Sequence, residues 1–67
     1  MFKLASNEYI AVSPDGDSII IGTPGDSWKD PSLPTFTGEI AEEILNEYVD
    51  RIVELDDDGH FNKPNNI

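Results

Sequence analysis

The chain has 67 residues, and its 14 aspartates and glutamates outnumber four lysines and arginines, giving a formal net charge of −10 at pH 7. This excess argues against nucleic acid or an anionic membrane as a direct ligand, and it favours basic proteins or cations as partners. A chain this short forms one small domain with a marginal core, and the absence of cysteine excludes disulfides and thiolate metal sites.

Three further expectations follow from size and pattern. No stretch of the sequence approaches the 18 apolar residues of a membrane span, and residues 1–4 are followed by polar residues rather than by a signal-peptide pattern. We therefore predict a cytoplasmic location, in the host cytoplasm if the source is viral. The sequence carries no catalytic triad and no phosphate-binding loop, and a fold this small has little room for a deep substrate pocket. We predict a protein that is not an enzyme and needs no cofactor.

The first predicted elements are two strands joined by a tight turn. Residues 9–12 and 18–22 are rich in β-branched residues, and the SPDG sequence at 13–16 favours a type I turn followed by a glycine bulge. A further strand at 2–4 is predicted at the edge. The segment YIAVSPDGDSIIIG resembles the hairpin of a β-propeller blade, a resemblance that implies a hairpin and no function.

The turn also predicts which residues pair. We expect Tyr9 opposite Ile21, Ile10 opposite Ile20 and Ala11 opposite Ile19. The face with Tyr9, Ala11, Ile19 and Ile21 is then the more apolar and is predicted to carry a helix. The other face, with Ile10, Val12 and Ile20, would be covered by a loop, by the N-terminal segment or by another chain.

A long connection follows at residues 23–36, where four prolines and glycines (Pro24, Gly25, Pro31 and Pro34) disfavour regular structure. Loops of this length are commonly functional or disordered. Trp28, Leu33 and Phe36 are spaced as anchors. Either they pack back onto the core, or Trp28 and Phe36 contact a partner.

Residues 38–55 are predicted to form one amphipathic helix, with Thr37 as its N-cap. At about 100° per residue, the apolar side chains fill an arc of about 220°, which packs under the sheet or in part meets another chain. The apolar positions are Ile40, Ala41, Ile44, Leu45, Tyr48, Val49, Ile52, Val53 and Leu55. Three aspartates at 56–58 would lie unfavourably near the negative end of the helix dipole, so the last turn from Ile52 is alternatively extended.

The opposite arc of this helix is almost entirely acidic, with Glu39, Glu42, Glu43, Glu47, Asp50 and Glu54. Like charges spaced four residues apart destabilise a helix slightly, and only the Glu47–Arg51 pair is expected to offset this. Such a face is either a solvated surface or a surface that imitates a row of phosphates and docks on a basic partner. The predicted partner-binding residues are Glu39, Glu43, Glu47, Asp50, Glu54, Trp28 and Phe36.

The C-terminal residues allow two interpretations. DDDG at 56–59 favours a second turn, spanning 56–61, that completes a domain at 1–62 and leaves 63–67 as a flexible tail. Alternatively, the spacing of Glu54, Asp56, Asp58 and Gly59 after a helix resembles an EF-hand calcium loop. That resemblance implies weak calcium binding by Glu54, Asp56 and Asp58, but Asn65 stands where the family has its bidentate glutamate.

These patterns predict an α+β fold, in which a small antiparallel hairpin or three-stranded sheet carries one amphipathic helix on one face. The small size, the one-sided charge and the lack of a catalytic signature resemble the physical character of phage-encoded anti-defence proteins, including anti-CRISPR and DNA-mimic inhibitors. We therefore predict an acidic inhibitor that binds a basic, nucleic-acid-binding host protein. The alternatives are a self-associating, antitoxin-like accessory homodimer, whose acidic face only gives solubility, and a weak calcium-binding module.

Overall fold

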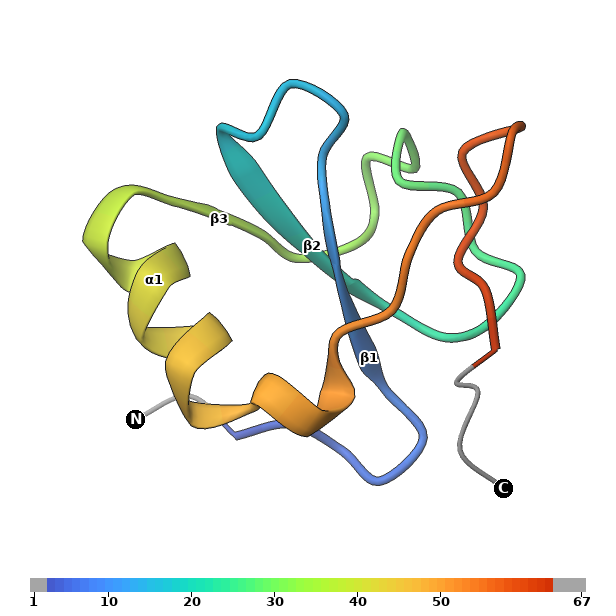
Figure 1. Cartoon of the computed structure of the whole chain (residues 1–67). Coiled ribbons are helices and arrows are strands. Elements are labelled where there is room, and N and C mark those ends of the chain that lie inside the picture. The colour runs from blue at the N-terminus through green and yellow to red at the C-terminus, as the bar shows by residue number, and fades with distance from the viewer. Residues whose placement is uncertain (1–2, 64–67) are drawn as a thin grey trace.

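The computed structural model describes residues 3–63 and shows a three-stranded antiparallel sheet with one helix packed against it, which is the predicted α+β fold (Figure 1). The sheet has the order β1-β2-β3, so that β2 is central. The elements are β1 (Tyr9–Val12), β2 (Ser18–Gly22), β3 (Thr35–Thr37), α1 (Gly38–Glu47) and the short 3-10 helix η1 (Val49–Arg51).

The predicted hairpin is confirmed in its strands and in its turn. Gly16 has φ +78° and donates its N–H to the carbonyl of Ser13 (2.9 Å), as a turn over SPDG requires. The predicted register is wrong by one residue, because Tyr9 pairs with Gly22 rather than with Ile21. The buried Ser13 explains the shift: its N–H and its Oγ bond to Ser18, so that these two serines close the hairpin one residue later than predicted.

A slip of one residue moves each side chain of β1 to the opposite face relative to β2. The helix therefore packs on the face that carries Ile10, Ile19 and Ile21, and not on the predicted face with Tyr9 and Ala11. Ala41 and Ile44 are the buried residues that α1 contributes to this first cluster. Leu4, Phe36, Leu45 and Tyr48 pack around it.

The third strand is not the predicted one. Lys3 and Leu4 are outside any strand, and Phe2 lies outside the described residues. Instead, the end of the predicted loop forms β3, which pairs Phe36 with Ile19. Proline fixes an extended φ, and the carbonyl of Pro34 accepts the N–H of Ile21 (3.0 Å), so the loop enters the sheet directly after this proline.

The predicted helix at 38–55 is too long, because α1 ends at Glu47. Tyr48 leaves the helical region with φ −116° and ψ 42°, and after η1 the backbone at Ile52 is extended. Ile52 pairs in parallel with Ile10 along the free edge of β1, and the N–H of Val53 donates to the carbonyl of Ile10 (2.8 Å). The chain thereby crosses to the other face of the sheet, where Val53 is buried.

A second cluster fills that other face, so neither side of the sheet is left open. Its buried residues are Ala11, Ile20, Val53 and Phe61, and Tyr9, Trp28, Leu33 and Leu55 pack against it. The loop after β2 and the C-terminal segment run side by side here (Figure 1): the N–H of Phe61 donates to the carbonyl of Asp26 (2.7 Å), and the N–H of Trp28 donates to that of Gly59 (2.9 Å). These contacts order the predicted loop.

Within residues 3–63, no helix has the length and apolar character needed to cross a membrane.

Candidate partner-binding surface

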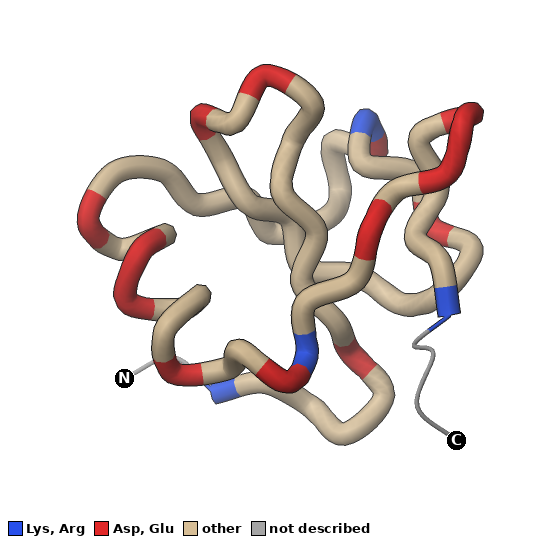
Figure 2. The backbone as a smooth tube through the Cα atoms, viewed as in Figure 1, with Lys and Arg blue, Asp and Glu red and all other residues tan. Residues whose placement is uncertain are grey.

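The acidic residues of α1 gather on the side of the helix that points away from the sheet. The helix buries Ala41 and Ile44, while Glu39, Glu43 and Glu47 are exposed. At about 100° per residue these three glutamates lie within one arc opposite the buried residues. Figure 2 shows acidic segments following α1 and continuing into η1 along one border of the molecule. We call this surface the acidic helix face; it consists of Glu39, Glu42, Glu43, Glu47 and Asp50.

Within the described chain, the carboxylates on the helix do not take part in the hydrogen bonds that hold the turns. Other acidic side chains accept hydrogen bonds that hold turns, as Asp26 does from the N–H and hydroxyl of Thr23 (2.9 and 3.0 Å). Glu8, Asp15, Asp30 and Asp56 accept comparable bonds. Within residues 3–63 no such bond and no ion pair involves Glu39, Glu43 or Glu47. Their charges are therefore available to another molecule.

Arg51, which was predicted to pair with Glu47 on this face, instead directs its guanidinium to the N-terminal segment. The guanidinium of Arg51 donates to the carbonyls of Ser6 and Glu8, the latter at 2.8 Å, and lies 4.4 Å from the centre of the Tyr9 ring. The expected Glu47–Arg51 ion pair is absent among the described residues. Arg51 ties the N-terminal segment to η1, and within residues 3–63 no ion pair involves the acidic helix face.

Two apolar side chains flank this face and reach solvent. Ile40 is 57% exposed and Val49 is 64% exposed, although the sequence pattern assigned both to the buried arc. Val49 lies in η1, beyond the end of α1, and Ile40 lies on α1 but is not one of its two buried residues, Ala41 and Ile44. Acidic residues beside exposed aliphatic ones form a surface suited to a basic partner with some apolar area.

A cavity of about 310 Å³ opens beside α1, between this helix and the hairpin turn. The helix contributes one strip of residues at helical spacing: Gly38, Ala41, Glu42 and Leu45. The hairpin contributes Val12, Gly16, Asp17, Ser18 and Ile19. Sequence reasoning missed this cavity and the presence of Asp17 in its lining. The cavity forms because β3 places the start of α1 next to the hairpin turn, and the sequence pattern did not predict β3.

The predicted aromatic anchors lie against the core. Trp28 is half-buried on the second cluster, and Phe36 is half-buried beside the first. Glu54 is exposed but follows the crossing to the other sheet face, so it does not extend the acidic row of α1. The structure thus brings Glu39, Glu43, Glu47 and Asp50 together on one exposed surface. Trp28 packs on the opposite face of the sheet and Glu54 follows the crossing to that face, whereas Phe36 packs beside the first cluster, next to the buried side of α1.

The second predicted turn is present, and it gathers a different group from the EF-hand expectation. The carboxylate of Asp56 accepts the N–H groups of Asp58 and His60 (both 2.9 Å), and Asp56 and His60 also pair through their backbones. Single ligand atoms of Asp56, Asp58 and His60 lie within 4.8 Å of one another, and Glu54 does not belong to this group. Asn65 lies outside the described residues.

We expect this turn to contribute stability that is lost in acid. The pKa of Asp56 lies below its ordinary value of 3.8, chiefly because its carboxylate accepts the His60 N–H, with further help from the Asp58 N–H and the nearby imidazole. A depressed pKa in the folded state means that the contribution is complete above the ordinary value and is lost as the pH falls through the folded value. In urea unfolding between pH 6 and pH 2.5, the stability difference between wild type and Asp56→Asn should shrink below about pH 4. A difference independent of pH would contradict this account.

The fold and this surface define a small α+β protein whose helix α1 exposes a row of carboxylates. Comparisons with protein-family models, curated proteins and solved structures give no match.

Proposed function

We propose that the protein is a small acidic inhibitor that occupies a basic, nucleic-acid-binding surface of another protein. The observation that carries this proposal is the unpaired acidic helix face. Glu39, Glu43 and Glu47 follow one another at about 6 Å along the helix axis, since each residue rises about 1.5 Å. Every second phosphate of one DNA strand advances by about 6.8 Å. A groove that binds a phosphate backbone therefore meets a similar spacing of negative charge on α1.

The remainder of the molecule supports a role in binding. The carboxylates that stabilise turns are distinct from those on α1, so the acidic helix face can be changed without disturbing the fold. The exposed Ile40 and Val49 provide apolar area at the border of the charged surface. We place the partner in the same compartment as this protein, which we propose to be the cytoplasm, and assign it a positively charged surface that normally holds DNA or RNA.

Charge reversal on α1 tests the proposal. We expect Glu43→Lys combined with Glu47→Lys to weaken partner binding by roughly 100-fold, because like charges facing each other across an interface cost several kcal/mol. The measurement is affinity capture from a cell lysate at low salt, elution in a salt gradient and identification of the eluted protein. Its affinity for wild type and variant is then measured at several salt concentrations.

The matched control is Asp57→Lys with Asp58→Lys, which makes the same change in net charge at the C-terminal turn and should leave binding within a few fold. The proposal requires that duplex DNA or RNA displaces the wild-type protein from its partner, and that affinity falls steeply with salt. Equal effects of the two double variants, or a partner that nucleic acid does not displace, would contradict it. Recovery of the protein alone, as a salt-resistant oligomer, would instead favour self-association through Ile40 and Val49.

A further inference from the structure

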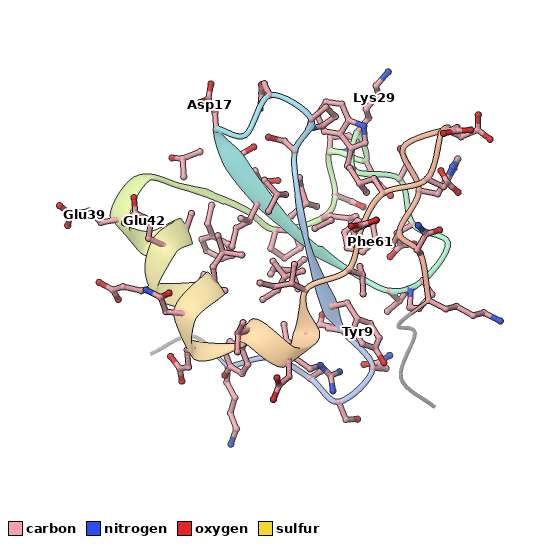
Figure 3. All side chains as sticks on the ribbon, in the orientation of Figure 1. Tyr9, Asp17, Lys29, Glu39, Glu42 and Phe61 are labelled. Carbon is pink, nitrogen blue, oxygen red and sulfur yellow. The ribbon has the colours of Figure 1, made fainter. Side chains whose placement is uncertain are left out.

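The cavity beside α1 combines an apolar floor with two carboxylates, Glu42 from the acidic helix face and Asp17 from the hairpin turn. The base of the cavity is apolar, because it is lined by the buried Ile19 and Ala41 and by the half-buried Leu45. Asp17 and Glu42 are exposed and line the same cavity from the hairpin and from the helix. Figure 3 shows Glu42 on α1 and Asp17 in the hairpin turn directly before β2.

The size and lining of the cavity restrict what it can hold. A cavity of about 310 Å³ lies at the lower end of the range for small-ligand sites, so it has room for a small group such as one side chain but not for an extended molecule. Lysine and arginine have an aliphatic stem that packs on apolar surface and a charged head that stays near water. The described structure places an apolar floor beneath and carboxylates at the opening, which is the complementary arrangement.

The turn that carries Asp17 is held in a defined shape. Asp15 accepts the N–H of Asp17 (3.0 Å) and the hydroxyl of Ser13, so its carboxylate holds the turn, whereas within residues 3–63 no hydrogen bond engages the side chain of Asp17. On the other side of the cavity, Glu42 belongs to a regular helix. Both carboxylates are therefore positioned by their backbones, and neither needs to give up an internal partner in order to bind a cation.

We infer that this cavity receives a single lysine or arginine side chain of the basic partner, with the stem on Ile19, Ala41 and Leu45 and the cationic head between Asp17 and Glu42. This inference rests on the proposed function and deepens it: the acidic helix face attracts the basic surface, and the cavity fixes one of its side chains. An anion is the competing occupant, because the N-terminal end of α1 is also nearby at Gly38. Glu39 and Glu42 already place negative charge near that positive end of the helix, which disfavours an anion there.

The test uses small probes and does not depend on knowing the partner. Isotope-labelled protein is titrated with n-butylguanidinium and n-butylammonium, which carry the stem and head of arginine and lysine, while backbone amide shifts are recorded by NMR. We expect saturable shifts at Gly16, Ser18, Gly38 and Glu42, with dissociation constants of about millimolar size, as the few atoms of such probes allow. Guanidinium without the stem should bind more weakly, and butyrate should leave these amides unchanged.

Variants locate the binding. Asp17→Asn with Glu42→Gln should weaken n-butylguanidinium binding by roughly two- to fivefold for each lost charge. Glu54→Gln with Asp57→Asn removes the same charge elsewhere and should leave the titration unchanged. Both pairs change exposed side chains, and the dispersion of the amide spectrum checks that each variant is folded. Shifts spread evenly over all exposed carboxylates, or equal shifts with butyrate, would overturn the inference.

The two proposals fail in different ways. If the captured partner binds Asp17→Asn/Glu42→Gln as tightly as wild type but loses affinity for Glu43→Lys/Glu47→Lys, the acidic helix face acts and the cavity does not. If n-butylguanidinium binds in the cavity while no partner displaceable by nucleic acid is captured, the cavity accepts a cationic side chain and the inhibitor proposal is wrong.

Discussion

Replacing Phe61 with alanine is expected to unfold the protein or to leave it close to unfolding. Phe61 is 3% exposed and belongs to the second cluster, on the sheet face opposite α1. Truncating a buried phenylalanine to alanine costs about 3–5 kcal/mol. A domain of this length has a total stability of roughly 3–10 kcal/mol, at 0.05–0.15 kcal/mol per residue. One substitution therefore removes a large part of the stability, and circular dichroism in a urea series measures the loss.

The backbone hydrogen bonds of Phe61 do not involve its side chain: the N–H of Gly25 donates to the carbonyl of Phe61, and the N–H of Phe61 donates to the carbonyl of Asp26. The experiment thus isolates the side chain. Ile52→Ala is the matched control: Ile52 pairs with β1 but is 38% exposed, so its truncation should cost about 1 kcal/mol. If Phe61→Ala were no more destabilised than Ile52→Ala, the C-terminal segment would not belong to the core in solution.

The hairpin was predictable because its signals are local. Ser13, Pro14, Asp15 and Gly16 each favour their place in the turn, and the β-branched residues on both sides favour strands. The exact pairing was not predictable from turn composition alone. It depends on a hydrogen bond from the backbone N–H of Ser18 to Oγ of Ser13, and a register shift of one residue exchanges the faces of β1.

The helix illustrates the opposite case, in which a good periodic pattern extends past the true end of an element. Val53 and Leu55 continue the apolar period of α1, yet both pack on the second cluster. Their burial requires the chain to leave the helix at Tyr48 and pass the edge of β1. Periodicity records that a residue is buried but not which layer buries it, so tertiary packing decided where the helix ends.

The candidate site divides in the same way. The acidic helix face was readable from the sequence, because residues on one helix surface follow from spacing alone. The lack of an ion pair on this face, within the described residues, was not readable from the sequence. The pattern paired Glu47 with Arg51, whereas in the structure Arg51 donates to the carbonyls of Ser6 and Glu8. The cavity is lined by residues from 12–19 and from 38–45. These segments are distant in sequence, and they meet because β3 pairs with β2 and α1 follows β3 directly.

Substituting alanine for Gly59 should destabilise the protein by about 2–5 kcal/mol, for two separate reasons. Gly59 has φ +84°, a backbone conformation that costs other residues about 1–2 kcal/mol. A Cβ at this position would also lie 2.7 Å from both Cδ1 and Nε1 of Trp28. Overpacking of this kind typically costs a further 1–3 kcal/mol, because the ring must move away from the second cluster.

Two other glycines separate these effects. Gly16 and Gly25 have φ +78° and +97°, and a Cβ at either one meets nothing within 4 Å. Gly16→Ala and Gly25→Ala should therefore show the backbone cost alone, about 1–2 kcal/mol, and urea unfolding of the three variants measures the difference. Trp28 is the single tryptophan of the chain, so its fluorescence reports whether the ring is displaced in Gly59→Ala.

A second substitution shows whether the contact with Trp28 is the cause. In a Trp28→Leu background, where the indole is absent, Gly59→Ala should cost no more than Gly16→Ala does, because only the backbone term remains. An unchanged cost in that background would assign the whole effect to φ. Equal costs for Gly59→Ala and Gly16→Ala in the wild-type background would mean that Trp28 does not lie over Gly59 in solution. The pairing of the 23–33 segment with the C-terminal turn, which closes the second face of the sheet, would then be wrong.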